Sequence, residues 1–90
     1  MLELKDFEAA YNKVQEVVLP TKLIKSDYFS DQTGNDVYLK PENMQLTGAY
    51  KIRGAYYKIS TLSEEEKAKG LITASAGNHA QGVALAAARQ

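Results

Sequence analysis

The sequence predicts an α/β fold with an open, mostly parallel sheet and flanking helices. In its second half, a predicted strand is followed by a turn and a helix, which is the order typical of such sheets. The strand is the apolar run at residues 71–74, and it precedes a glycine turn and a helix-forming run at residues 79–90. A second strand is predicted at residues 37–40, where branched and aromatic side chains alternate until Pro41 ends the run. Ninety residues form at most one unit with a modest core.

The first elements are predicted from helical spacing and from turn residues. Apolar side chains recur at helical intervals from Phe7 to Val18, with Asp6 as the expected N-cap and Pro20 as the end of the segment. Residues 21–24 are expected to be extended. Residues 26–35 are expected to form a loop, because they end in a glycine–asparagine turn signal.

Two further helices are predicted before the second apolar run. A polar connector at residues 42–48 leads into a helix from about Lys51 to Ile59, which carries four apolar residues on one side: Ile52, Ala55, Tyr56 and Ile59. Ser63 precedes three glutamates, as a capping residue precedes an acidic first turn, and Gly70 is expected to end this short helix.

Composition and charge exclude several classes of function. Basic and acidic side chains both number 11, so no global field favours nucleic acid or an acidic membrane. The chain has no cysteine, and its single histidine cannot build a usual zinc site. No signal peptide or membrane-length apolar run is present, and we expect a cytoplasmic protein.

The first candidate for chemistry is Lys51, which lies midway between Gly48 and Gly54. Glycines let the backbone pass close to a bound molecule, and a lysine enclosed by such a segment could be partly desolvated. Desolvation lowers the pKa of an amine and makes it a nucleophile toward an aldehyde, as in a Schiff base. The alternative is an ordinary solvated lysine near a helix start.

The second candidate is the segment Ser75–Gly82, which lies between the predicted strand and the last helix. A small-residue loop at a helix N-terminus lets an anion approach unpaired N–H groups, and the Asn78 amide adds a fixed donor or acceptor. The alternative is a tight turn with a helix cap. A Ser75–His79 catalytic pair is disfavoured at this spacing, and the glycines do not form a dinucleotide fingerprint.

Three motifs in order resemble the fold-type II pyridoxal-phosphate enzymes, most closely the threonine/serine dehydratases. Residues 47–55, Thr-Gly-Ala-Tyr-Lys-Ile-Arg-Gly-Ala, are similar to the cofactor-lysine motif of that family. Residues 75–82, Ser-Ala-Gly-Asn-His-Ala-Gln-Gly, are similar to its substrate-carboxylate loop, and residues 40–45 to its lead-in strand and connector. The resemblance implies that residues 1–90 are a single unit, the N-terminal part of a catalytic domain whose remainder is absent.

The resemblance also implies roles for individual residues. Lys51 would hold pyridoxal 5′-phosphate, and Asn78 would hydrogen-bond the cofactor's 3-hydroxyl. Four residues would line the site of the substrate carboxylate: Ser75, Gly77, Asn78 and His79. The family usually has Ser-Phe before the lysine, whereas this chain has Ala49-Tyr50, which leaves open any polar contact made by that serine.

The implied reaction is the dehydration and deamination of L-threonine to 2-oxobutanoate and ammonia, and of L-serine to pyruvate, within amino-acid metabolism and isoleucine biosynthesis. The partners expected are an amino-acid substrate and further copies of the complete enzyme, with no nucleic acid and no membrane. The loop that cups the cofactor phosphate is missing, so we expect these ninety residues to be inactive alone. Two alternatives are a non-catalytic module that binds a small anion or nucleotide, and a structural or partner-docking domain.

Overall fold

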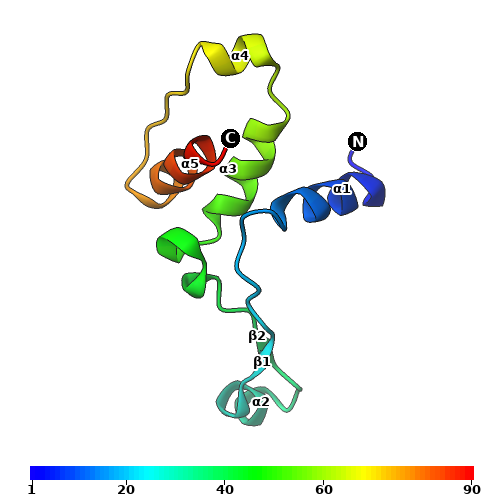
Figure 1. The fold of residues 1–90 in the computed structure, drawn as a ribbon. Coiled ribbons are helices and arrows are strands. Elements are labelled where there is room, and N and C mark those ends of the chain that lie inside the picture. The colour runs from blue at the N-terminus through cyan, green and yellow to red at the C-terminus, as the bar shows by residue number, and fades with distance from the viewer.

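The computed structural model describes all ninety residues. It has five helices: α1 (Leu4–Val14), α2 (Asp27–Thr33), α3 (Lys51–Ser60), α4 (Glu64–Ala68) and α5 (Asn78–Ala88). It also has two short strands, β1 (Ile24–Lys25) and β2 (Tyr38–Leu39), and two 3₁₀ turns, η1 (Glu42–Met44) and η2 (Leu46–Gly48). Figure 1 shows the β1–β2 hairpin and α2 extending as an arm, residues 24–39, away from α3 and α5. None of the helices combines the length and the apolar character needed to cross a membrane.

The core lies where α3 packs against α5. The predicted helix from Lys51 is confirmed as α3, and its four apolar residues are all buried: Ile52, Ala55, Tyr56 and Ile59. Ala86 of α5 and Val17 complete this cluster, in which Ile52 and Ala86 are fully buried. Only nine of the ninety residues are buried, so the α3–α5 contact provides most of the apolar burial in this chain.

Helix α1 begins three residues earlier and ends four residues earlier than the spacing predicted. Its N-cap is Glu3, and the prediction of Asp6 as N-cap is wrong. Asp6 instead lies in the first turn, where its carboxylate accepts a hydrogen bond from the Glu3 N–H at 2.7 Å. The two residues form a reciprocal capping box, so an acidic side chain still stabilises this helix end.

The arm contains a helix where the sequence predicted a loop. Helix α2 begins after Ser26, whose hydroxyl accepts a hydrogen bond from the Phe29 N–H at 3.2 Å, and it ends at Gly34 with φ of 69°. These two caps are sufficient to define a short helix without a buried face. The predicted strand at residues 37–40 is confirmed as β2, which pairs antiparallel with β1.

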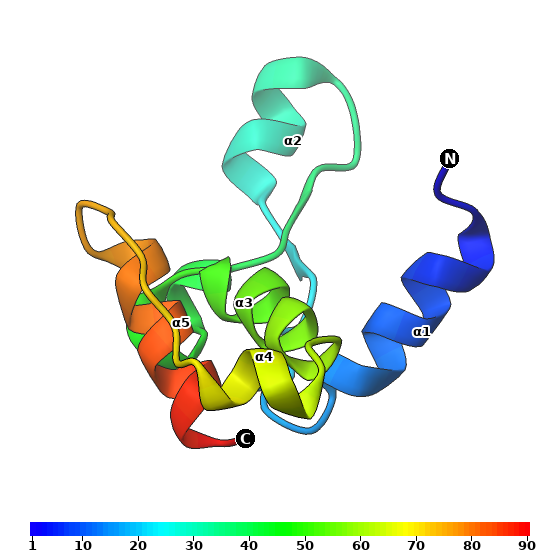
Figure 2. The ribbon, with the colours of Figure 1, turned by 90° about the horizontal axis from the view of Figure 1, so that it is seen from above.

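The strand predicted at residues 71–74 does not form. This segment has no regular structure, none of its backbone groups is hydrogen-bonded, and the Ile72 side chain is 99% exposed. A strand requires a neighbouring strand for its N–H and C=O groups, and neither β1 nor β2 pairs with this segment. Figure 2 shows the segment as an open connector from α4 to α5. The sheet present is two-stranded and antiparallel, so the predicted parallel sheet is not formed.

Helix α4 matches its prediction in both caps. The Ser63 hydroxyl accepts a hydrogen bond from the Glu66 N–H at 3.1 Å, and the Glu66 carboxylate accepts one from the Ser63 N–H at 2.9 Å. The hydrogen bonds from Ser63 hold the pKa of Glu66 below its ordinary value. Gly70 follows the helix with φ of 80°, the left-handed conformation expected of a terminating glycine.

Candidate functional site

Lys51 is the first residue of α3, which follows η2 after two residues, Ala49 and Tyr50. Its ammonium lies 5.2 Å from the centroid of the Tyr50 ring, a cation–π distance. The Lys51 amine forms no ion pair, whereas Glu42 on the adjacent turn is occupied by Arg53. The amine is therefore not neutralised by a carboxylate and is available to a ligand.

The structure brings the two sequence motifs together in one hollow. Its volume is about 340 Å³, and it is lined by Lys51 and by the loop before α5: Ser75, Ala76, Gly77, Asn78 and His79. The contact between α3 and α5 places Lys51 beside a loop more than twenty residues later in the chain. All predicted site residues thus share one location, while their roles toward cofactor and substrate stay predictions.

The loop in front of α5 is organised by the Ser75 hydroxyl. That oxygen accepts hydrogen bonds from the Gly77 N–H at 3.1 Å and from the Ala80 N–H at 2.9 Å, so Ser75 caps the helix. The N–H groups of Asn78 and His79 have no partner in the structure. Two free donors and the hydroxyl hydrogen of Ser75 are thereby left for an anion at the positive end of the helix dipole.

Thr47, in η2 shortly before Lys51, has a backbone conformation that sequence reasoning missed. It has φ of 67°, a left-handed conformation that is a genuine outlier for a branched residue, and Gly48 follows with φ of 72°. The hydroxyl oxygen of Thr47 is buried and has no hydrogen-bond partner. Only Gly48 signals this bend in the sequence, because threonine normally avoids such a conformation.

An ion pair secures α3 just beyond Lys51. The Glu42 carboxylate accepts two hydrogen bonds from Arg53, both at 2.9 Å, and a third from the Thr21 hydroxyl at 2.8 Å. The bonds from Arg53, with that from Thr21, lower the pKa of Glu42 to about 2 despite the opposing effect of burial. This bidentate contact ties the first turn of α3 to η1, and residue spacing alone could not have paired the two side chains.

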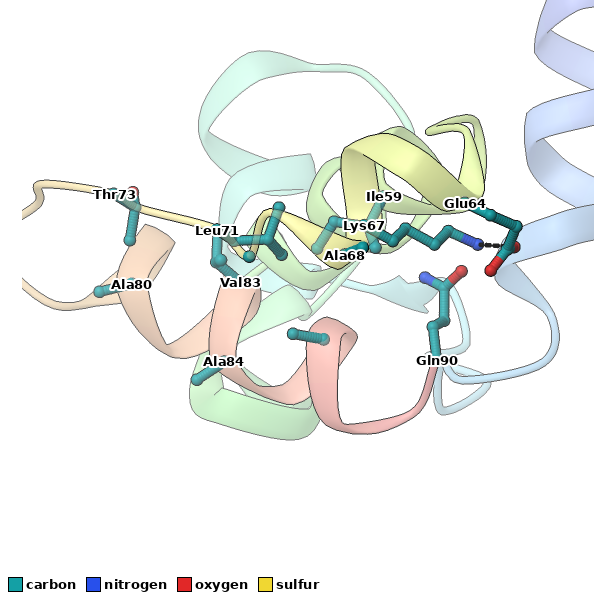
Figure 3. Close-up of a pocket in the computed structure, with 12 residues that line it drawn as sticks. Ile59, Glu64, Lys67, Ala68, Leu71, Thr73, Ala80, Val83, Ala84 and Gln90 are labelled. Atoms are coloured by element: carbon teal, nitrogen blue, oxygen red, sulfur yellow. Dashed lines mark ion pairs between the residues drawn. The ribbon is translucent and has the colours of Figure 1, made fainter.

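A larger hollow lies elsewhere, between α4, the connector and α5 (Figure 3). Its volume is about 680 Å³, and most of the side chains that line it are apolar. Its lysine, Lys67, lies 3.7 Å from the Glu64 carboxylate, so the amine has a counter-ion. The smaller hollow is the better candidate site, because it combines an amine without a counter-ion with free helix N–H groups.

A family model described as "Pyridoxal-phosphate dependent enzyme" matches residues 14–90 of the chain. The chain is 55% identical over 87 residues to the L-threonine ammonia-lyase of Thermotoga maritima, covering 97% of this chain and 22% of that protein. It is 56% identical over 88 residues to the L-threonine dehydratase catabolic TdcB of Staphylococcus aureus strain N315, covering 97% and 25%. The chain therefore spans about a quarter of the length of these curated relatives.

The chain is also similar to solved structures. The processed form of threonine deaminase isoform 2 from Solanum lycopersicum superposes with a TM-score of 0.78 at 41% identity, covering 98% of this chain and 27% of that chain. Maize serine racemase superposes with a TM-score of 0.85 at 36% identity, covering 94% and 27%. Since the family model spans most of the ninety residues, the chain belongs to the pyridoxal-phosphate dependent enzyme family, whose cofactor is pyridoxal 5′-phosphate.

Proposed function

We propose that the complete protein is a threonine ammonia-lyase that converts L-threonine to 2-oxobutanoate and ammonia, and L-serine to pyruvate and ammonia. The observation that carries the proposal is the hollow that Lys51 and the loop Ser75–His79 line together. Relatives named as L-threonine ammonia-lyase and L-threonine dehydratase support this choice of substrate.

The residues of the hollow fit the family's cofactor. The Lys51 amine has no counter-ion and would bind the aldehyde carbon, and the Asn78 amide would hydrogen-bond the ring hydroxyl. When bound, the cofactor supplies an electron sink for charge that develops at the substrate α-carbon.

The substrate carboxylate fits the loop in front of α5. The N–H groups of Asn78 and His79 are free to donate to it, and the Ser75 hydroxyl can donate its hydrogen while it continues to cap the helix. Gly77 has φ of 153°, a conformation favoured by glycine, and lacks a side chain that would screen these donors. Charge-assisted hydrogen bonds of this kind orient the amino acid with its α-carbon toward Lys51.

The chain's own residues then account for movement of the proton. Once the substrate amino group has displaced it from the aldehyde carbon, the Lys51 amine is free, and its Nζ accepts the proton from the substrate α-carbon. The electron pair of that C–H bond forms a double bond to the β-carbon as the C–O bond breaks. The protonated Lys51 Nζ gives its proton to the departing β-hydroxyl, which leaves as water. One water then hydrolyses the resulting enamine, in its imine form, to the 2-oxo acid and ammonia, so the net change from threonine is loss of ammonia.

A matched pair of lysine variants tests the proposal in the complete protein. Lys51→Ala should abolish 2-oxobutanoate formation, followed with a coupled 2-oxo acid reductase, whereas Lys58→Ala on the same helix should retain it. Borohydride reduction followed by peptide mapping should place the cofactor on the Lys51 peptide. A label on Lys58 or Lys40, or no oxo acid from either threonine or serine, would overturn the proposal.

A second candidate is a non-catalytic module that binds a small anion or nucleotide, which would need only the loop and its free N–H groups. Adding pyridoxal 5′-phosphate separates the two. A new absorbance band that disappears in Lys51→Ala supports the lyase, whereas anion binding without such a band supports the module.

We also propose that residues 1–90 are inactive by themselves and that the complete protein is a homo-oligomer. These residues lack a glycine-rich phosphate cup of the family's kind, so cofactor binding to them alone should be of millimolar class, about −4 kcal/mol. Titration of the ninety-residue chain with the cofactor, followed by a threonine assay, tests whether these residues are inactive by themselves. Tight binding with ordinary turnover would refute it.

A further inference from the structure

Gly82 lies at the closest approach between α5 and α3. A Cβ atom built on Gly82 would lie 3.1 Å from the Lys51 carbonyl carbon, 3.2 Å from the Ile52 nitrogen and 3.2 Å from the Lys51 carbonyl oxygen. These distances are shorter than ordinary van der Waals contacts of a methyl group. All three neighbours are backbone atoms, so the strain could be relieved only by moving one helix relative to the other.

This contact joins the two parts of the candidate site. On one side it touches the backbone of Lys51, and on the other it belongs to the helix whose first residue is Asn78. Gly82 follows Asn78 by about one helical turn, so a displacement of α5 at Gly82 is transmitted to the loop. Ile52 and Ala86 are fully buried at the same helix crossing and leave little freedom for local adjustment.

We propose that Gly82 is a positioning residue, which fixes the separation between the Lys51 amine and the loop Ser75–His79 by allowing the two helix backbones into contact. The functional part of this inference rests on the proposed function. Without a Cβ at position 82, Lys51 and the loop with the carboxylate donors line one hollow of about 340 Å³. With a Cβ at position 82, we expect α3 and α5 to move apart by a few tenths of an ångström at this contact, which would widen the hollow.

A second glycine provides the control. Gly54 lies on α3, three residues after Lys51, and a Cβ atom built there meets nothing within 4 Å. Gly54→Ala adds the same methyl group to the Lys51 helix without touching α5. A difference between the two variants therefore reports the helix contact and not the loss of a glycine.

The test uses the complete protein and two independent measurements. Crystal structures should show the Lys51 to Asn78 Cα distance increased in Gly82→Ala and unchanged in Gly54→Ala. The kcat for threonine, expressed per mole of borohydride-fixed cofactor so that unfolded protein does not count, should fall about tenfold or more in Gly82→Ala. The circular dichroism of the bound cofactor should change in Gly82→Ala.

Equal kcat and equal helix separation in the two variants would overturn the proposal. Absence of turnover in the unsubstituted protein would refute the proposed function, and the crystallographic distance would still test the positioning by Gly82. If Gly82→Ala does not fold, Gly82→Ala combined with Ala86→Gly removes a methyl group from the same face. Restored folding with low kcat supports the proposal, whereas restored folding with normal kcat, or failure to fold, assigns Gly82 to packing alone.

Discussion

The body formed by α3 and α5 and the arm formed by β1, α2 and β2 are stabilised in different ways. The body contains five of the six residues of the apolar core cluster, whereas no side chain of α2 is buried and both residues of each strand are exposed. The arm is held by its two helix caps and by a two-residue ladder. Tertiary packing therefore defines the body, and local hydrogen bonds define the arm.

This difference indicates which part of the chain can hold side chains in a fixed geometry. All predicted site residues belong to the body, in which helix positions are set by buried contacts. The segments that connect the arm to the body, residues 15–23 and 40–50, form a junction held by polar contacts, notably the Glu42–Arg53 ion pair and the hydrogen bonds of the Gln45 side chain to Leu19. We expect the arm to tolerate changes that would displace the site if made in the body.

The largest effect is expected from a pair of isoleucine variants. Ile52→Ala in the body should lower the free energy of unfolding by about 2–5 kcal/mol, because it leaves a cavity at a fully buried position. Ile24→Ala in the arm, where the side chain is 55% exposed, should cost less than about 1 kcal/mol. Urea denaturation measures both. Equal costs would remove the distinction between body and arm.

The junction offers the next largest effect. The buried Gln45 side chain accepts a hydrogen bond from the Leu19 N–H at 2.8 Å and donates one to the Leu19 carbonyl oxygen at 2.9 Å. Gln45→Ala leaves both backbone groups without a partner and should cost about 1–3 kcal/mol in urea denaturation. The control is Gln32→Ala on the exposed α2, which should change the free energy of unfolding by less than about 0.5 kcal/mol.

Acidification should weaken the same junction. The pKa of Glu42 in the folded protein is about 2, against an ordinary value of 4.5, so the Arg53 contact stabilises fully above about pH 4.5 and loses its effect as the pH falls toward 2. Both side chains are partly exposed, and Glu42→Gln should therefore cost roughly 1–2 kcal/mol at pH 7. Urea denaturation at pH 7, 4 and 3 should show this cost shrinking. A cost independent of pH would contradict the assignment.

The smallest effect should be confined to the arm. Ser26→Ala removes the hydroxyl that accepts from the Phe29 N–H and should cost α2 about 1 kcal/mol. Because no side chain of α2 is buried, the loss should appear as faster hydrogen exchange of α2 amides, with the global unfolding midpoint unchanged. A shift of that midpoint by several degrees would show that the arm and the body unfold together.

The sequence predicted elements whose signals are local or periodic. Apolar spacing identified the buried face of α3, and Ser63 with Glu66 identified the start of α4. Helix α2 was missed because its apolar residues, Tyr28 and Phe29, are adjacent and form no stripe at helical spacing, although its two capping residues were present. The strand at residues 71–74 was wrong because strand formation depends on a neighbour, which an apolar run cannot guarantee.

For the candidate site, the sequence identified which residues come together but not how they are held. Lys51 and the loop Ser75–His79 were found by their motifs, and the structure places them around one hollow. The cap formed by Ser75, the left-handed Thr47 and the contact of Gly82 with Lys51 depend on three-dimensional geometry. No periodic pattern encodes such contacts, so they could be recognised only in the structure.

The late position of α5 also determines when this chain can fold during synthesis. Ile52 is buried in a cluster that includes Ala86, a neighbour that leaves the ribosome more than thirty residues later. At translation speeds of about 5–20 residues per second, the apolar face of α3 stays uncovered for roughly two seconds or longer. During this interval the apolar face of α3 is exposed to chaperones and to other chains, and it is not covered by α5 until that helix has emerged.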